Sequence, residues 1–203
     1  DDSGTKATGK NLASATLSLD NAARLNDLFY LTWMQDLGGS SPGARGTHGY
    51  VAHYSLPYGY WQLGFTASYN TYNQAVAGTA QTYRYSGESS NREIRLSRVF
   101  YRDAVRKSTL SIKGWLRTSN NFIDDTEVQV QRRRMAGWEL GLTHRENLAS
   151  ATLVANLAYR RGTNALGALP APEEAFGEGT ARPSFFTADA QITVPFQLAS
   201  QSL

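Results

Sequence analysis

Hydrophobic and polar residues alternate along several parts of the chain. In the clearest example, residues 61–70, one set of alternate positions holds Trp61, Leu63, Phe65, Ala67 and Tyr69, and the other holds Gln62, Gly64, Thr66, Ser68 and Asn70. Successive side chains of a β-strand point to opposite faces, so this period of two predicts a strand with one apolar and one polar face. Comparable runs occur at residues 151–160 and 186–196. Weaker ones occur at residues 13–19, 29–34, 50–56, 94–100, 110–117 and 138–143, which makes nine predicted strands in total.

The segments between the predicted strands alternate in length. Short, turn-like links span residues 20–27, 57–60, 101–107 and 145–150, and long links rich in glycine and polar residues span residues 36–49, 71–91, 119–129 and 162–184. A soluble Greek-key sandwich has no reason to gather its long loops at one end. An outer-membrane barrel does, with short turns on the periplasmic side and long loops outside. The sequence therefore predicts an all-β fold, a transmembrane antiparallel β-barrel, with a soluble lectin-like sandwich as the alternative.

Composition agrees with a barrel and excludes several other classes. Hydrophobic residues make up 41% and charged residues 18% of the 203 residues, and no apolar run approaches the roughly 20 residues of a spanning helix. The mean hydropathy of −0.42 is typical of alternating strands, whose apolar and polar residues average out. Cysteine is absent, which excludes disulfides, and the net charge of +3 is too small and scattered to indicate nucleic acid as a partner. The first residues lack a signal-peptide pattern, so we expect a mature chain or an internal piece.

The sequence holds no recognisable catalytic constellation. His48, His53 and His144 are too dispersed for a metal pair, and no His-Glu-x-x-His motif occurs. Neither a Gly-x-Ser-x-Gly elbow nor a Walker A loop is present. The Gly177–Gly179 segment lacks the third glycine of a dinucleotide-binding turn. We therefore expect no enzyme activity and no cofactor.

Charged and amide side chains occupy the polar face of the predicted strands. They are Lys113, Arg117, Glu139, Arg160 and Asp189, together with Asn156 and Gln62. In a barrel this face lines the wet lumen, whereas an arginine at mid-membrane on the lipid face would cost about 2–4 kcal/mol. These residues fit a conduit through which a polypeptide could slide; alternatively, they only pair with one another or with a plug. Arg98 shares a face with apolar residues, and its place beside a short turn indicates snorkelling into the periplasmic interface.

Two groups of charges lie in and just after the predicted extracellular loop at residues 119–129. Asp124 and Asp125, with Glu127, could hold a calcium ion, but they lack the Asp-x-Asp-x-Asp spacing, which favours a solvated loop. The run Arg132, Arg133 and Arg134 could pair with these acids or with lipopolysaccharide phosphates. A plain polar extension of a strand is the alternative for this run.

Several stretches together resemble one family. They are DDSGTKATGK at 1–10, LSLDN at 17–21 followed by LND at 25–27, HYSLPYGYW at 53–61, YSGESSN at 85–91, LSRVFYRDAVRKSTLS at 96–111, NNFIDDTEVQVQRRR at 120–134, GWELGLTHREN at 137–147, AYRRGTNALG at 158–167 and VPFQL at 194–198. Single pieces are weak signals, but the ordered set covers essentially the whole chain. It resembles the barrel region of the TpsB transporters of two-partner secretion, the haemolysin secretion/activation family within the Omp85 superfamily.

The resemblance implies an architecture larger than this chain. TpsB transporters have two POTRA domains and a plug helix before a sixteen-stranded barrel, and a Val-Arg-Gly-Tyr/Phe loop motif after the eleventh strand. The sequence shows none of these, so we expect residues 1–203 to be a partial barrel domain, approximately strands two to ten. The odd count of nine agrees, because bacterial single-chain barrels have even strand numbers.

The resemblance also implies a function and a location. The complete protein would be a monomeric pore in the outer membrane of a Gram-negative bacterium, in contact with lipid and lipopolysaccharide. It would export a large TpsA-type exoprotein (a haemolysin, adhesin or contact-dependent toxin) in type Vb secretion. A general diffusion porin and an Omp85-type factor that inserts outer-membrane proteins are the alternatives.

Overall fold

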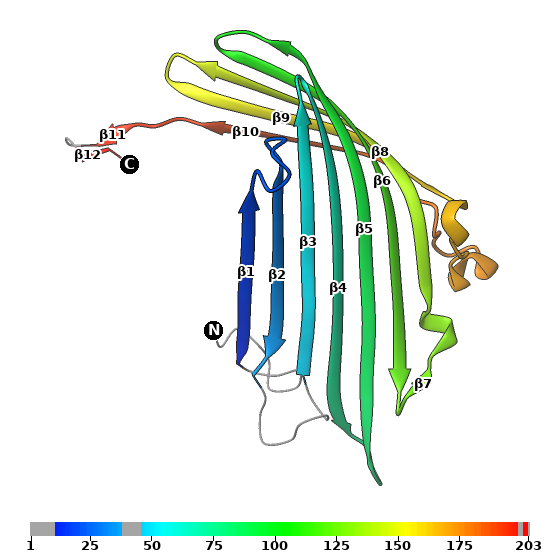
Figure 1. The fold of residues 1–203 in the computed structure, drawn as a ribbon. Helices are drawn as coiled ribbons and strands as arrows, with labels where there is room; N and C mark the ends of the chain where they lie inside the picture. The colour runs from blue at the N-terminus through cyan, green and yellow to red at the C-terminus, as the bar shows by residue number, and fades with distance from the viewer. Residues whose placement is uncertain (1–10, 38–45, 199–200, 203) are drawn as a thin grey trace.

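The computed structural model describes residues 11–37, 46–198 and 201–202. Nine long strands form one antiparallel sheet (Figure 1). They are β1 (Leu12–Asp20), β2 (Leu28–Asp36), β3 (Gly46–Tyr58), β4 (Trp61–Ala77), β5 (Thr82–Arg102), β6 (Arg106–Ile123), β8 (Arg133–Leu148), β9 (Ala151–Thr163) and β10 (Ser184–Thr193). The nine strands predicted from the alternation are confirmed. The family-like stretch at 1–10 and part of the predicted loop at 36–49 lie outside the described residues.

Smaller elements join the long strands. Strand β7 (Thr126–Glu127) pairs with β6, and β11 (Gln197–Leu198) pairs with β12 (Gln201–Ser202) in a separate two-stranded sheet. The helices of the described residues are three short 3-10 helices, η1 (Gln129–Gln131), η2 (Ala165–Gly167) and η3 (Pro172–Phe176). None of them is long and apolar enough to cross a membrane.

The sheet is strongly curved and open. Each long strand pairs with the next one along the chain, and β6 pairs with β8 across the small β7 hairpin. In Figure 1 the curvature turns β9 and β10 well away from the direction of β1 and β2. Within the described residues β1 and β10 do not pair with each other, so the sheet does not close on itself.

Strand register carries the alternation of the sequence across the whole sheet. Leu63 pairs with Leu96, Leu96 with Ile112, and Ile112 with Leu140, so apolar residues stay on one face from strand to strand. We call this apolar side the outer face and the opposite side, which carries residues such as Arg95 and Lys113, the inner face. A one-residue slip in any pair would move side chains to the wrong face, so this continuity fixes the register.

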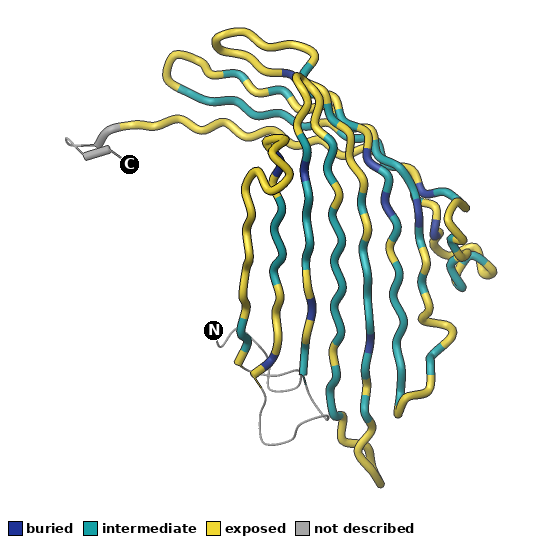
Figure 2. The backbone as a smooth tube through the Cα atoms, viewed as in Figure 1, coloured by how far each residue is buried: buried dark blue, intermediate teal, exposed yellow. Residues whose placement is uncertain are grey.

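The burial pattern is the reverse of that of a soluble sandwich. The buried apolar residues among those described are only Trp115, Ala136 and Ala181, and the largest fully buried side chain is that of Asp27. Figure 2 shows most of the sheet as exposed or intermediate, with buried positions scattered singly. Large apolar side chains of the outer face, such as Ile112 and Leu157, are about half exposed. Such a face is stable when lipid covers it, as in a transmembrane barrel.

The predicted difference between the two ends of the sheet holds, but two of the long loops are shorter than expected. Most of the predicted loop at 71–91 is strand, because β4 and β5 continue to a turn at residues 78–81. The predicted loop at 119–129 is likewise partly strand, since β6 runs to Ile123 and pairs with β7. Neither segment alternates regularly between apolar and polar residues, so the period of two does not reveal these parts of the strands. The twenty-residue link between β9 and β10 is long, as predicted.

Asp27 organises the turn between β1 and β2. Its carboxylate accepts hydrogen bonds from the backbone N–H groups of Ala23, at 3.0 and 3.1 Å, and Leu25, at 3.3 Å. Burial acts to raise the pKa of Asp27, but these bonds and the Tyr54 hydroxyl outweigh it and hold the pKa below its ordinary value. Three residues of this turn, Asn21, Arg24 and Asn26, have φ near +60°, a tight path that the buried carboxylate stabilises.

Candidate functional site on the inner face

All seven residues predicted to face a lumen lie on the inner face of the sheet. Lys113 pairs with Glu139, and Glu139 with Arg160, so these three stand side by side on β6, β8 and β9. The remaining four occupy alternate positions of the same face: Gln62 on β4, Arg117 on β6, Asn156 on β9 and Asp189 on β10. The structure therefore brings the predicted polar residues together on one surface.

Lys113, Glu139 and Arg160 form one ion-pair network. The Glu139 carboxylate lies 2.9 Å from Lys113 Nζ and 2.8 Å from Arg160 Nη2. The Lys113 side chain is only 8% exposed and that of Glu139 16%, so both charges are held against the wall. Arg160 also lies over the Trp115 ring, with its guanidinium carbon 5.4 Å from the ring centroid. These three residues thus pair with one another, and two cations on one carboxylate leave the network with one net positive charge.

A second polar row crosses the sheet nearer its short-turn end. The Thr143 hydroxyl donates to Asn156 Oδ1 at 2.8 Å, and Asn156 Nδ2 donates to Asp189 Oδ2 at 2.9 Å. Within the described part of the chain, the side chains of Gln62 and Arg117 form no hydrogen bond or ion pair and are exposed. The inner face therefore combines charges that are already paired with a few polar groups free to meet a passing chain.

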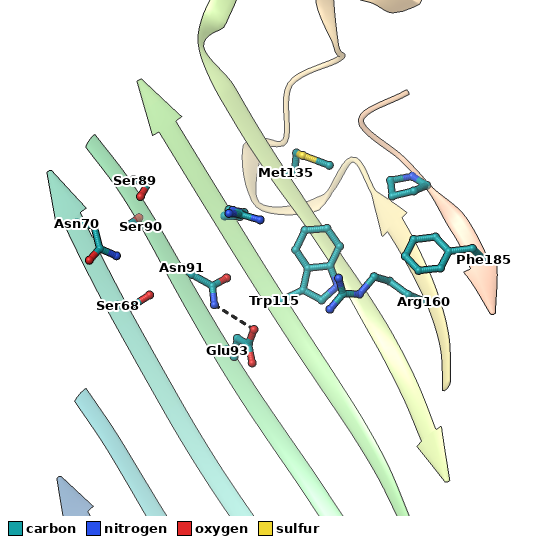
Figure 3. A pocket seen from close by; sticks show the side chains of 12 residues that line it. Ser68, Asn70, Ser89, Ser90, Asn91, Glu93, Trp115, Met135, Arg160 and Phe185 are labelled. Carbon is teal, nitrogen blue, oxygen red and sulfur yellow. Dashed lines mark hydrogen bonds between the residues drawn. The ribbon is translucent and has the colours of Figure 1, made fainter. Parts of the chain in front are cut away.

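Two hollows follow the inner face. The first, of about 560 Å³, is lined by polar side chains of β4 and β5 and by Trp115, Arg117, Arg160 and Phe185 (Figure 3). In that view the Arg160 side chain reaches toward the Trp115 ring, and Asn91 donates to Glu93 at 3.0 Å. The second hollow, of about 420 Å³, surrounds Arg95 with hydroxyl groups. They belong to Tyr30, Ser55, Thr66, Ser97, Thr109, Ser111 and Thr143.

Three residues of the inner face were not among those predicted from the sequence. Glu93 and Arg95 alternate with the apolar residues Ile94 and Leu96, so the period of two could have placed them on the inner face. Trp115 gave no such signal, because an aromatic residue on a polar face looks like an exception. In the structure the ring packs over Gly137, and its indole nitrogen is buried without a hydrogen-bond partner among the described residues.

Asp124 and Asp125 form the turn between β6 and β7. Both have positive φ, +46° and +65°, as a tight hairpin turn requires. Asp124 accepts a hydrogen bond from the backbone N–H of Arg84 at 2.8 Å, and Asp125 forms an ion pair with the Arg84 guanidinium. The described residues contain no group of three or more His, Asp or Glu side chains that could hold a metal ion. Arg84 on β5 is thus a partner of both carboxylates.

The pairing suggested between the run Arg132–Arg134 and the neighbouring acids is found for Glu127 but not for Asp124 or Asp125. Arg132 pairs with Glu127, and Arg133 pairs with Glu173 of η3 at 2.5 Å. Arg134 donates from Nε to the Leu166 carbonyl oxygen at 2.9 Å. Arg133 and Arg134 begin β8, where successive side chains point to opposite faces. The run therefore ties the link between β9 and β10 to the end of β8.

A second ion pair lies within the link between β9 and β10. Arg182 Nη2 lies 2.8 Å from Glu174 Oε2. The backbone N–H of Ala181, together with the Arg182 guanidinium, lowers the pKa of Glu174 to about 2. The carboxylate is therefore charged throughout the physiological range, and its ion pair with Arg182 persists across that range.

Sequence comparison agrees with this architecture. All of residues 1–203 match the family model described as haemolysin secretion/activation protein ShlB/FhaC/HecB. The chain belongs to this family. The outer membrane transporter CdiB-2 of Burkholderia pseudomallei is 33% identical over 99% of the chain and 34% of its own length. The hemolysin transporter protein ShlB of Serratia marcescens is 29% identical over 83% of the chain and 30% of its own length.

Solved structures of the family have the same fold. CdiB from Escherichia coli superposes with a TM-score of 0.89 over 97% of the chain and 36% of that protein, at 23% identity. CdiB from Acinetobacter baumannii gives a TM-score of 0.77 at 27% identity over 94% of the chain and 33% of that protein. The chain thus spans about a third of the length of the curated relatives and structures that it matches. It has the barrel fold of the family and is placed in the outer membrane of a Gram-negative bacterium.

Proposed function

We propose that this chain forms one side of a protein-conducting pore that exports a large partner exoprotein in two-partner secretion. The observation that carries the proposal is a polar inner face that continues across all nine strands, opposite an apolar outer face. The chain also belongs to a family of secretion proteins. The cargo would be a haemolysin, an adhesin or a contact-dependent toxin. This agrees with the names of the relatives, two of which are an outer membrane transporter and a hemolysin transporter.

The chemistry of the inner face suits transport of an unfolded chain. Its least exposed charges, Lys113 and Glu139, are paired with each other, so neither is free to bind a charged side chain of the cargo. Hydroxyl and amide groups supply hydrogen bonds that water can replace at little cost. Transport through such a wall requires no catalytic residue, cofactor or ATP. Folding of the cargo outside the cell would drive export, because burial of its apolar surface makes return unfavourable.

We further propose that the nine strands are approximately strands two to ten of a sixteen-stranded, monomeric barrel. An open sheet leaves unpaired edges that lipid cannot satisfy, and the described sheet has two such edges, at β1 and β10. Further strands of the same protein would satisfy them. The outer face would then contact lipid and lipopolysaccharide.

Deletion of the complete gene tests the export role. We expect loss of one cognate exoprotein from the culture medium, with other outer-membrane proteins at normal levels. Unchanged secretion would refute the proposal and favour a diffusion porin. A general loss of outer-membrane proteins would refute it in favour of an insertion factor.

A further inference from the structure

Two arginines lie on the outer face where an apolar surface is expected. Arg92 on β5 pairs with Ala67 and Leu116, and Arg161 on β9 pairs with Trp138, all outer-face positions. Both arginines are exposed, and neither forms a hydrogen bond or ion pair within the described residues. A charge on the lipid side of a barrel without a counter-charge is unfavourable unless it reaches the interface. Both residues therefore need an account.

Their position along the strands points to the extracellular interface. On β5, only Ile94 and Leu96 lie on the outer face between Arg92 and Arg98. Arg98 lies at the short-turn end, 5.1 Å from the centroid of the Trp61 ring. Six residues of strand span roughly 20 Å, less than the apolar band of about 25 Å once the strand is tilted. Arg92 and Arg98 must therefore extend in opposite directions along the strand. Arg98 extends toward the short-turn end, and Arg92 extends toward the extracellular headgroups.

A small polar hollow lies beside Arg92. It has a volume of about 140 Å³, and its lining includes Tyr50, Tyr69, Ser90 and Thr118. The Ser90 and Thr118 hydroxyl oxygens are 2.8 Å apart. A hydroxyl-lined hollow on a lipid-facing surface would be costly against hydrocarbon, so it suits a polar headgroup.

The one carboxylate in this hollow, that of Glu88, is already engaged. It accepts hydrogen bonds from the Tyr69 hydroxyl and from Asn120 Nδ2, both at 3.0 Å. No ion pair joins it to Arg92, although both residues line the hollow. The guanidinium of Arg92 is therefore available to an external anion.

Arg161 on β9 marks the same boundary three strands further along the sheet from β5. It follows Tyr159, whose ring packs against Trp138 and Phe186 at centroid distances of 5.5 and 4.7 Å. Aromatic girdles of this kind mark the interface of outer-membrane barrels. Arg134, nearby on β8, is held by the Leu166 carbonyl and is not available in the same way.

We propose that Arg92 and Arg161 bind the phosphate groups of the anionic glycolipid that forms the outer leaflet of the outer membrane. A guanidinium offers paired N–H donors that match phosphate oxygens. The hydroxyls of Ser90 and Thr118 lie beside Arg92 to contact the sugar of the headgroup. This site rests on the membrane placement of the outer face and is independent of the export role.

Lipid binding to the complete protein tests this site. The probe is a bisphosphorylated lipid A-type glycolipid, added to the detergent-purified protein and measured by native mass spectrometry. Because each basic residue near an anionic surface contributes about a fivefold gain in binding, we expect Arg92→Gln and Arg161→Gln each to weaken binding about fivefold. The double variant should weaken it about twenty-five-fold.

Controls separate this site from general charge effects and from misfolding. Arg117→Gln removes an exposed, unpaired arginine of the inner face and should leave binding unchanged. Arg92→Lys with Arg161→Lys keeps the charge and should retain most of the binding. Phosphatidylcholine and inorganic phosphate should bind the native protein much more weakly than the glycolipid. Unchanged glycolipid binding in the double variant, or an equal loss in Arg117→Gln, would overturn the proposal, whatever the result of the secretion test.

Discussion

Glu139 is the residue on which two cations of the inner face depend. Its carboxylate binds both Lys113 and Arg160, at 2.9 and 2.8 Å. Because only 8% of the Lys113 side chain is exposed, Glu139→Gln would leave its ammonium group against the wall without a counter-charge. Loss of one partner from a buried ion pair costs about 3–5 kcal/mol. We expect the lower value, about 3 kcal/mol, because water in the lumen can reach part of the site.

Loss of Arg160 should destabilise the protein less than loss of Glu139. Arg160→Gln should cost about 1 kcal/mol or less, because 36% of the Arg160 side chain is exposed. Urea unfolding of the complete protein in detergent micelles, followed by tryptophan fluorescence, measures the free energy of unfolding. The fraction that migrates as folded barrel in unheated gels provides an independent reading.

A double variant tests whether the cost arises from the unpaired charge. Lys113→Met with Glu139→Leu removes both charges and leaves apolar side chains of similar size. We expect it to cost about 1 kcal/mol, less than Glu139→Gln alone, because no buried charge remains. A double variant at least as destabilised as the sum of its single variants would refute this reasoning.

Two further pairs of variants test the face assignment and the packing of the sheet. Leu157→Arg puts a charge on the outer face of β9, so it should cost about 2–4 kcal/mol and block membrane assembly. Asn156→Arg, beside Asp189 on the inner face, should assemble. Equal tolerance of the two variants would overturn the face assignment. Gly137→Ala should cost about 1–3 kcal/mol, because a Cβ there would lie 2.3 Å from the Arg161 carbonyl oxygen. Gly114→Ala, whose Cβ would meet only Ile94 at 3.4 Å, should be close to neutral in the same unfolding assay, and the reverse order would contradict the packing.

The strands could be predicted because side chains in a half-covered sheet must alternate. Residues 61–70 follow this rule at every position, and β4 includes all of them. The rule fails at residues 71–77 and 82–91, which are strand in the structure but do not alternate regularly between apolar and polar residues. The full lengths of β4 and β5 therefore could not be predicted from the alternation.

The inner face could be predicted in composition but not in its pairing. Alternation alone places Lys113 and Glu139 on the polar face, but their contact depends on the register of β6 against β8. That register depends on the connection between β6 and β8, which contains β7 and η1. Neither of these two elements could be predicted from the sequence. The same limit applies to Arg133, whose partner Glu173 lies forty residues away and could not be predicted from the local sequence.

Contact between the cargo and the inner face during export tests the central proposal most directly. A photo-crosslinking amino acid can replace Arg117, which is exposed on the inner face, or Ile112, which is 51% exposed on the outer face of the same strand. Irradiation of secreting cells that carry the complete protein should yield an adduct with the exoprotein from position 117 and none from position 112. Absence of an adduct at position 117, or equal adducts at both positions, would contradict a protein-conducting lumen bounded by this face.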